Sequence, residues 1–276
     1  MKNKIAALHL SNLWLALLAI TTLASCTKYN IVGTSDMQDV DGRMLYLRAL
    51  TGDKPQGLDS CDVVHGKFTF SGALDSVQVV MLCLDNNAVI PVVLEDGKIT
   101  VEMNEQRQSC KGTPLNDTLT AFTTRYRQLV QQMEDLEHTQ NQAYMNAEDM
   151  DQVNARLGAI QQLLLEKEDK LVSGFIADNF DNCLGPYVFL MSTQAYEYPV
   201  LTPWIEALMA KATDTFKNNP IIKEYMEAAQ HNQDVMTGAA DIKENTPQMD
   251  GVTPQMPGNP HSGAIDNKPF TIDPTK

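Results

Sequence analysis

The sequence predicts an α+β fold, in which an N-terminal antiparallel β-sandwich or open barrel precedes an α-helical hairpin or bundle domain. Three observations support this prediction. Up to residue 112, short apolar runs alternate with polar residues and end at Gly, Asp or Asn, which is typical of antiparallel strands. From residue 113 to about residue 236, apolar residues recur every three or four positions, which indicates helices. Residues 237–276 show neither pattern.

The composition restricts the class of partner. The chain has 276 residues and a net charge of −14, and this length suits about two domains. An excess of carboxylates repels a polyanion, so the charge argues against a protein that binds nucleic acid through its phosphates. We therefore expect no nucleic-acid partner.

Residues 1–25 are expected to be a secretory signal. Two lysines near the start precede an apolar run over residues 13–23, which is shorter than the ~20 residues that a membrane-spanning helix needs. The following Leu23-Ala24-Ser25-Cys26 resembles the bacterial lipobox, whose cysteine is lipidated and becomes the first residue of the mature chain. The alternative interpretation is a plain signal peptide with an unrelated cysteine after the cleavage site.

A lipid on Cys26 predicts a protein anchored to a membrane of the cell envelope. Several acyl chains on one cysteine hold a protein far more firmly than a single chain does. Because residues 1–25 hold two lysines and no acid, the net charge of residues 26–276 is −16. No cluster of acids follows Cys26, and we therefore expect the protein at the outer membrane, facing the periplasm.

Residues 26–112 are expected to form the β domain. The clearest strand-like runs cover residues 43–50, 58–64, 67–70, 77–84, 88–94 and 98–103. The Asp96-Gly97 pair between the last two runs predicts a tight hairpin, because this dipeptide favours two-residue turns. Pro91 lies within a run, which predicts a strand at the edge of a sheet or a strand with a bulge, since proline lacks an N–H.

Residues 113–236 are expected to form the helical domain, which begins at Thr113-Pro114 because Thr is a capping residue and Pro suits the first helical turn. A first heptad seam consists of Leu119, Phe122, Tyr126, Leu129, Met133 and Leu136. A second seam, capped by Asn146, consists of Met150, Val153, Leu157, Ile160 and Leu164. The polar residues 138–144 lie between them. Two such seams predict an antiparallel hairpin, or alternatively a homodimer paired through the seam.

The rest of the chain offers fewer signals. Gly185-Pro186 interrupts the helical pattern, and Thr202-Pro203 and Asn219-Pro220 predict the starts of two further helices. Residues 237–276 are rich in Pro and Gly, and we expect them to be disordered because they hold little apolar surface to bury. A solvated linker and a tail that docks on a partner both fit this composition.

Several short motifs occur in an order that resembles one family. They are Asp41-Gly42, Leu58-Asp59-Ser60, Gly66-Lys67-Phe68-Thr69-Phe70-Ser71-Gly72, Leu94-Glu95-Asp96-Gly97 and Gly112-Thr113-Pro114-Leu115-Asn116. Residues 29–230 resemble the uncharacterised N-terminal domain of Bacteroidetes lipoproteins. In many members a thioredoxin-like domain follows the helical part. This chain contains no Cys-x-x-Cys motif, so the resemblance implies no oxidoreductase activity for it.

Four cysteines remain after Cys26: Cys61, Cys83, Cys110 and Cys183. Disulfides persist in exported proteins, but four cysteines can pair in three ways and the spacing does not choose among them. Cys61 and Cys110 are candidates to link neighbouring strands, and Cys83 is expected to be buried and inert. Cys183 is the cysteine expected in a loop, and a nucleophilic role there would need a lowered pKa.

No catalytic, cofactor-binding or metal-binding residue is predicted. The histidines beyond the signal are dispersed: His65, His138, His231 and His261. This spacing does not suit a transition-metal site. Asp36, Asp39 and Asp41 alternate as in a calcium loop, but the closing glutamate is missing, and we expect a polar turn there. Met133 and Met150 fall on the heptad seams and are expected to fill the core.

The leading functional hypothesis is a lipid-anchored envelope protein that binds or scaffolds a protein or glycan partner without catalysis. The first alternative is an accessory of thiol–disulfide lipoproteins that lacks the catalytic domain. A second alternative is a hydrolase whose site is assembled from residues far apart in the sequence.

Overall fold

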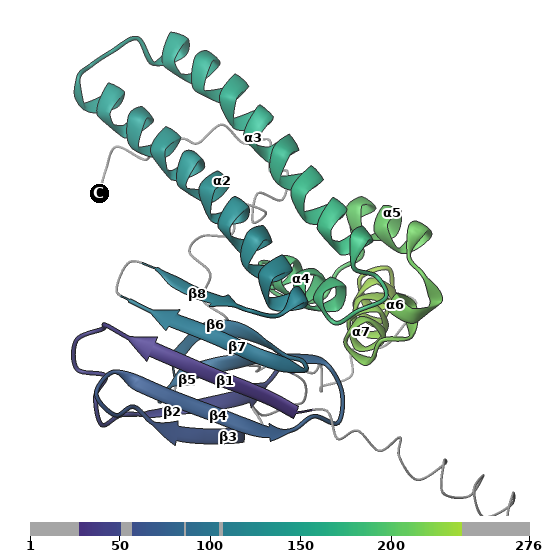
Figure 1. Cartoon of the computed structure of the whole chain (residues 1–276). Coiled ribbons are helices and arrows are strands. Elements are labelled where there is room, and N and C mark those ends of the chain that lie inside the picture. Colours follow the sequence, from purple (N-terminus) through teal and green to yellow (C-terminus); the bar gives the residue numbers. More distant parts are fainter. Residues whose placement is uncertain (1–27, 51–56, 86, 105–106, 239–276) are drawn as a thin grey trace, which may run out of the picture.

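The computed structural model describes residues 28–50, 57–85, 87–104 and 107–238, which form two β-sheets followed by a set of helices (Figure 1). The predicted signal peptide, Cys26, His261 and the predicted tail lie outside the described residues. Within the described ranges, no helix is both long enough and apolar enough to cross a membrane.

The described residues form two sheets of four strands. The strands are β1 (Lys28–Ser35), β2 (Met44–Ala49), β3 (Gly57–Asp62), β4 (Lys67–Ala73), β5 (Gln78–Leu84), β6 (Asn87–Leu94), β7 (Gly97–Met103) and β8 (Gln108–Lys111). One sheet has the order β4-β1-β7-β8 and the other the order β3-β2-β5-β6. The two sheets are separate and are not closed into a barrel. The pairing is also not purely antiparallel, because β1 and β7 run parallel.

The two sheets face each other across one hydrophobic core. Buried and exposed residues alternate along β1, β2 and β7, as expected for strands with one face in the core. β5 is buried on both faces, because Val80 and Leu82 point into this core while Val79 belongs to a second core with the helices. Pro91 lies in β6, at the end of its sheet, which confirms the prediction of an edge strand.

The predicted hairpin at Asp96-Gly97 is wrong. β6 and β7, which flank this pair, belong to different sheets, so the turn carries the chain from one sheet to the other. Gly97 has a φ of 120°, a conformation that favours glycine, and the turn chemistry was therefore identified correctly. The dipeptide marks a tight turn, but the pairing depends on β1, which lies beside β7 and runs parallel to it.

The helices confirm the expected hairpin. They are α2 (Pro114–Met145), α3 (Met150–Asp178), α4 (Leu184–Thr193), α5 (Pro203–Lys211), α6 (Asp214–Asn218) and α7 (Pro220–Met236). α2 and α3 lie side by side and antiparallel (Figure 1). The predicted starts at Pro114, Pro203 and Pro220 are confirmed. The helical seam pairs α2 with α3 inside one chain, and a homodimer stays a prediction.

Two details of the hairpin differ from the prediction. The polar stretch 138–144 is not a loop, because α2 continues through it to Met145. No glycine or proline interrupts this stretch, and Ala143 remains buried in the seam. The cap of α3 is Asp149 rather than Asn146, since the Asp149 side chain accepts hydrogen bonds from the N–H groups of Asp151 and Gln152.

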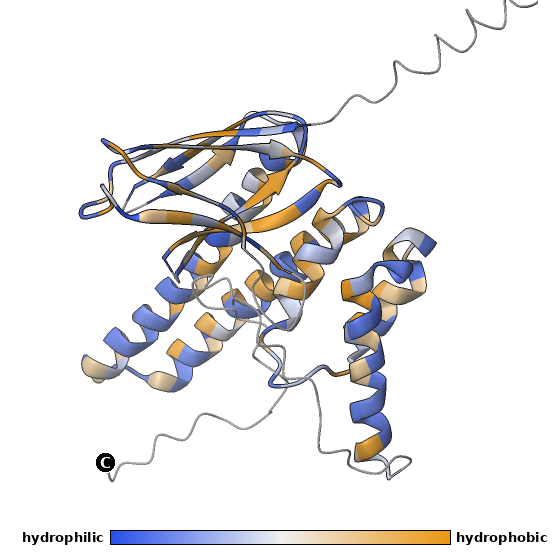
Figure 2. Ribbon diagram, turned by 90° about the horizontal axis from the view of Figure 1, so that it is seen from below, coloured by the Kyte–Doolittle hydropathy of each residue, from blue (hydrophilic) through white to orange (hydrophobic). Residues whose placement is uncertain are grey.

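The two halves of the hairpin are packed very differently. Near the sheets, buried residues of both helices join a large core that includes α4, α5 and α7. Farther out, the buried core consists of Ala143, Val153 and Leu157 alone, and Ile160 of the predicted seam is 41% exposed. Figure 2 shows mostly hydrophilic residues along this outer part. The outer hairpin is therefore a thin projection from a well-packed base.

Candidate functional site

A groove between β8 and the first half of α2 is a candidate site in the described part of the chain. Its volume is about 510 Å³. The lining residues are Arg107, Lys111, Asp117, Thr120, Ala121, Thr124, Arg125 and Gln128. β8 ends at Lys111 and α2 begins at Pro114, so the chain turns back on itself and the helix forms one wall of the groove while the strand forms the other.

The turn between the two walls is held rigidly. Gly112 has a φ of 104°, and a Cβ at this position would lie 2.6 Å from the Lys98 carbonyl oxygen, so no larger residue fits without displacing backbone. The Gly112 N–H donates to Asp117 Oδ1 at 3.0 Å. The Thr120 hydroxyl donates to the Cys110 carbonyl oxygen. These contacts fix the start of α2 against the end of β8.

The lining residues lie at different distances from the turn, and we call the part next to the turn the closed end and the part far from it the open end. Arg107 lies four residues before Lys111 along the strand, which is ~13 Å at ~3.3 Å per residue. Arg125 lies eight residues after Asp117 along the helix, which is ~12 Å at 1.5 Å per residue. Both arginines are thus similarly far from the turn along their own segments, and Figure 1 shows that α2 runs away from β8 beyond the turn. Arg107, Arg125 and Gln128 form the open end.

The groove is basic although the protein is acidic. Its described lining residues include three cations and one carboxylate, whereas the whole chain has a net charge of −14. Among the described residues, the one ion pair within 4.0 Å joins Arg43 and Asp85. No described carboxylate therefore lies within this distance of Arg107, Lys111 or Arg125. Both arginines and the lysine are exposed. They are available to a negatively charged ligand.

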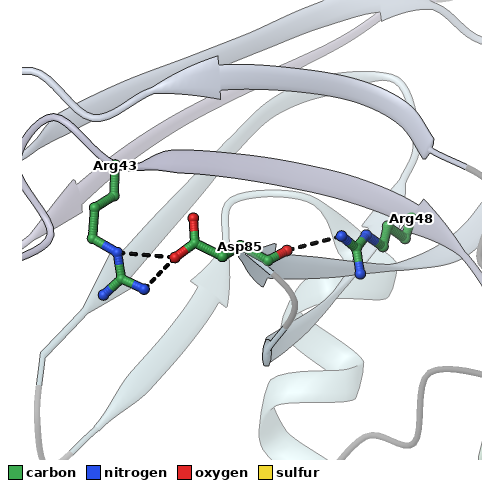
Figure 3. Close-up of polar contacts among 3 residues, drawn as sticks. All are labelled: Arg43, Arg48 and Asp85. Atoms are coloured by element: carbon green, nitrogen blue, oxygen red, sulfur yellow. Dashed lines mark hydrogen bonds and ion pairs between the residues drawn. The ribbon is translucent and has the colours of Figure 1, made fainter.

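A second group of arginines is already engaged. Figure 3 shows Arg43 and Arg48 on either side of Asp85. Arg43 Nε donates to Asp85 Oδ2 at 3.0 Å, and its Nη2 contacts the same oxygen. Arg48 Nη2 donates to the Asp85 carbonyl oxygen at 2.9 Å. Asp85 has a φ of 53° in the turn after β5, so these arginines stabilise a turn rather than offer a binding site.

A buried polar network joins the helical part to the β-sheets. Asn116, which is 1% exposed, donates from Nδ2 to the Val93 carbonyl oxygen and to Thr113 Oγ1, both at 2.8 Å. Its Oδ1 accepts from the Val93 N–H at 2.9 Å. Glu95 Oε1 accepts from the N–H groups of Leu115 and Asn116. A carboxylate from the β-sheet thus caps α2, and the hydroxyl of Thr113 does not cap it as predicted.

A buried carboxylate and a phenol meet inside the hairpin. Glu168 is 0% exposed and Tyr126 is 5% exposed. Burial, the negative charge of Glu168 and a hydrogen bond to it together raise the pKa of Tyr126. The pair lies within the helical interface and does not line the groove, so we assign it a structural role.

All four of the cysteines that follow Cys26 are free in the structure. Cys61 and Cys110 lie on β3 and β8. β3 contacts β4 at one edge of the two facing sheets, and β8 contacts β6 at the opposite edge. β3 and β8 are therefore not neighbours, and the predicted link between Cys61 and Cys110 is wrong. Cys83 is fully buried, as predicted.

The thiols are also poor nucleophiles. Burial raises the pKa of Cys61 and of Cys183 to about 11 and that of Cys110 to about 12. Burial also raises the pKa of Cys83. With their pKa raised, these thiols are protonated at neutral pH. The thiolate is the reactive form of cysteine, so the protonated thiols react slowly. Cys183 therefore lacks the lowered pKa that a nucleophilic role would need.

The remaining predicted polar residues lie apart from the groove. His65 is exposed in a turn with a φ of 51°. Asp36, Asp39 and Asp41 are exposed, and Asp41 accepts a hydrogen bond from the Gly66 N–H, as a polar turn would. Within the described ranges, no three His, Cys, Asp or Glu side chains come close enough together to hold a metal ion.

Sequence reasoning missed the groove. Arg107 and Lys111 are separated from Arg125 by the turn and the first turns of a helix, and no motif connects them. One signal was present: Asp117, Ala121, Thr124 and Gln128 recur at helical spacing beside the apolar seam. Small and polar residues at this spacing, next to the apolar seam, indicate a face of the helix that lies at the border between the core and the solvent.

Comparison with known families gives one match. Residues 29–119 match a family described as Domain of unknown function (DUF4369). The matched range includes Arg107, which precedes β8, and Lys111 at the end of β8, and it ends within α2, before Arg125 and Gln128. A comparison with curated proteins gives no match. The match therefore supports a domain of unknown function over the β-sheets and the start of α2. It assigns no activity and does not address the lipoprotein part of the resemblance.

Proposed function

We propose that this protein is a non-catalytic binding module of the cell envelope, anchored to the outer membrane on its periplasmic side by a lipid on Cys26. In this proposal the two facing sheets act as a β-sandwich-like platform that carries the groove. The observation that carries the binding function is the groove itself, with its three exposed cations on rigidly joined elements. The lipobox-like residues before Cys26 support the anchor.

The chemistry of the groove favours binding over reaction. Among its described lining residues there is no cysteine or histidine, and Asp117 is the one carboxylate. Acid–base catalysis needs a group positioned to exchange a proton with the substrate, but Asp117 accepts the Gly112 N–H through Oδ1 at the closed end. Guanidinium, ammonium and amide groups supply positive charge and hydrogen-bond donors. Such a set recognises a ligand without changing it.

The anchor is tested by replacing its cysteine. Cys26→Ser should move the full-length protein from the membrane fraction to the soluble fraction of the cell envelope. Cys61→Ser is the matched control, because Cys61 lies on β3 in the folded domain, and it should stay with the membrane. Retention of the Cys26→Ser variant in the membrane would exclude the lipid anchor.

The binding function is tested on protein extracted from its native envelope in mild detergent. Native mass spectrometry should detect a co-purifying ligand on the wild type that is lost from an Arg107→Gln/Arg125→Gln variant. Arg156→Gln on α3 should retain it, since Arg156 is also exposed but lies outside the groove. An identical bound mass on all three proteins would place the ligand elsewhere and contradict the groove's role.

The accessory role beside a thiol–disulfide protein has weaker support. It depends on the resemblance to lipoproteins that carry a thioredoxin-like domain, whereas the raised pKa of the thiols opposes it. Alkylation of the native protein by iodoacetamide at pH 7 tests this alternative. Rapid labelling of any of the four cysteines would favour it, and slow labelling of all four would exclude it.

A further inference from the structure

We propose that the open end of the groove binds a phosphate monoester, through Arg107, Arg125 and Gln128. This inference rests on the proposed binding function and specifies the ligand. The two arginines come from different elements, since Arg107 precedes β8 and Arg125 lies on α2. All three side chains line the same groove, so one ligand in the groove can contact all three.

Charge matching favours phosphate over carboxylate. Two guanidinium groups place two positive charges at the open end, and a phosphate monoester carries about −1.5 to −2 at neutral pH. A single carboxylate would neutralise only one arginine. The guanidinium fork also fits the oxygens of a phosphate bidentately. Gln128 adds an amide donor on the same wall as Arg125.

The hydroxyl groups of the groove do not alter this assignment. Thr120 donates to the Cys110 carbonyl oxygen, and Thr124 donates to the Thr120 carbonyl oxygen at 2.7 Å. Each hydroxyl has one hydrogen, so neither can donate to a ligand while these bonds hold. The donors that remain at the open end belong to the arginines and Gln128, and an oxyanion accepts hydrogen bonds from all of them.

Asp117 gives the site a direction. It lies ~12 Å along the helix from Arg125, which exceeds the ~8 Å Debye length at physiological ionic strength. Its repulsion therefore weakens anion binding at the closed end more than at the open end. The phosphate group should bind near the arginines, while an uncharged or hydroxyl-bearing part of the ligand extends toward Lys111 and Asp117.

The test is calorimetric titration of the full-length protein in detergent with defined probes. Glycerol 3-phosphate represents a soluble phosphate monoester, glycerophosphoglycerol represents the phosphodiester of a lipid headgroup, and glycerate is the carboxylate control. We expect the monoester to bind with the highest affinity and its affinity to fall as salt is added. Tighter binding of the diester would instead assign the phosphate to a lipid headgroup and overturn the monoester assignment. Equal binding of glycerate would overturn the phosphate assignment altogether.

Matched arginine variants locate the site. Arg107→Gln and Arg125→Gln should each weaken the binding of glycerol 3-phosphate by about tenfold or more, because each removes a charge-assisted hydrogen bond to the anion. Arg156→Gln should bind like the wild type. All three positions are exposed, so an unchanged thermal unfolding midpoint should confirm that each variant folds.

The outcomes separate this inference from the proposed function. If no phosphate probe binds, but native mass spectrometry still finds a ligand that the groove variant loses, the binding function stands and the phosphate inference fails. If glycerol 3-phosphate binds equally to the wild type and to the Arg107→Gln and Arg125→Gln variants, the site is not in this groove.

Discussion

The inner and outer halves of the α2–α3 hairpin share one sequence pattern but differ in packing. Both halves repeat apolar residues at heptad spacing. Near the sheets these residues join a core that includes β5, β6 and the later helices. Farther out, the two helices have only each other, and their buried core contains three residues. A heptad seam therefore predicts helix pairing, but the stability of that pairing depends on what a third element adds.

This difference bears on the groove. The groove is lined by residues of the inner half, where Asn116 and Glu95 tie the start of α2 to β6. Side chains on elements that their neighbours hold in place keep a binding geometry better than side chains on a thinly packed projection. The position of the groove at the base of the hairpin therefore matches the part of the helix that the fold holds most firmly.

The largest expected effect is at the buried polar joint between β6 and the start of α2. Asn116→Ala removes the partners of both the N–H and the carbonyl oxygen of Val93, as well as that of Thr113 Oγ1. Buried polar groups without partners destabilise a protein by about 1–3 kcal/mol each. We expect a loss of about 3 kcal/mol or more, measured as the free energy of unfolding in urea.

The outer hairpin supplies the control for this variant. Asn154 is exposed and accepts a hydrogen bond from Gln140 Nε2 at 2.8 Å. Because water can replace this partner, Asn154→Ala should change the free energy of unfolding by less than about 0.5 kcal/mol. Similar losses at the two asparagines would contradict the contrast between a fixed base and a loosely held projection.

A pair of valines on α3 tests the same contrast in the apolar core. Val172 is 0% exposed within the large helical core, and Val153 is 5% exposed within the small outer core. Val172→Ala should destabilise the protein by about 2 kcal/mol, and Val153→Ala by about 1 kcal/mol, because a thin core relaxes around a lost side chain more easily. Urea unfolding of both variants measures the difference, and equal losses would show that the two cores are packed alike.

Much of the fold could be predicted because it depends on local signals. Proline after a capping residue marked three helix starts correctly, at Pro114, Pro203 and Pro220. Proline inside a strand marked an edge, at Pro91. Each of these signals acts through the backbone of a few consecutive residues, and the sequence displays it directly.

The pairing of strands and the groove could not be predicted in the same way. The Asp96-Gly97 turn is local, but the strand that pairs with β7 is β1, far earlier in the chain. Similarly, Arg107 and Arg125 are brought together by the folding of a helix back along a strand, and their proximity has no sequence signature. Only the tertiary structure shows that their charges share one groove while those of Arg43 and Arg48 are engaged with Asp85.

The buried thiol next to the joint predicts a pH dependence. Burial raises the pKa of Cys110 from an ordinary 9.0 to about 12. The protonated Cys110 thiol therefore contributes its full stabilisation below pH 9. This stabilisation is lost as the pH rises toward 12, since the thiol releases its proton at a lower pH in the unfolded chain than in the folded protein. By pH 10 the loss should be about 1 kcal/mol.

Cys110→Ala isolates this contribution. The variant should be less stable than the wild type at pH 7, because Cys110 is buried, but its stability should fall less between pH 9 and pH 10. The measurement is the urea midpoint of both proteins across this range. If their pH profiles were parallel, the Cys110 thiol would not be the titrating group.

The smallest expected effect distinguishes two buried tyrosines of the inner core. Tyr187 is 3% exposed, and its hydroxyl has no hydrogen-bond partner among the described residues. The Tyr225 hydroxyl, in contrast, donates to the Val200 carbonyl oxygen at 3.1 Å and accepts from the Val200 N–H at 3.2 Å. Tyr225→Phe should therefore destabilise the protein by about 1 kcal/mol, while Tyr187→Phe should be neutral or stabilise it by up to about 1 kcal/mol. Thermal and urea unfolding would measure both changes. A clear destabilisation by Tyr187→Phe would mean that its hydroxyl has a partner, such as a buried water molecule, and that the base of the hairpin holds a polar site within its apolar core.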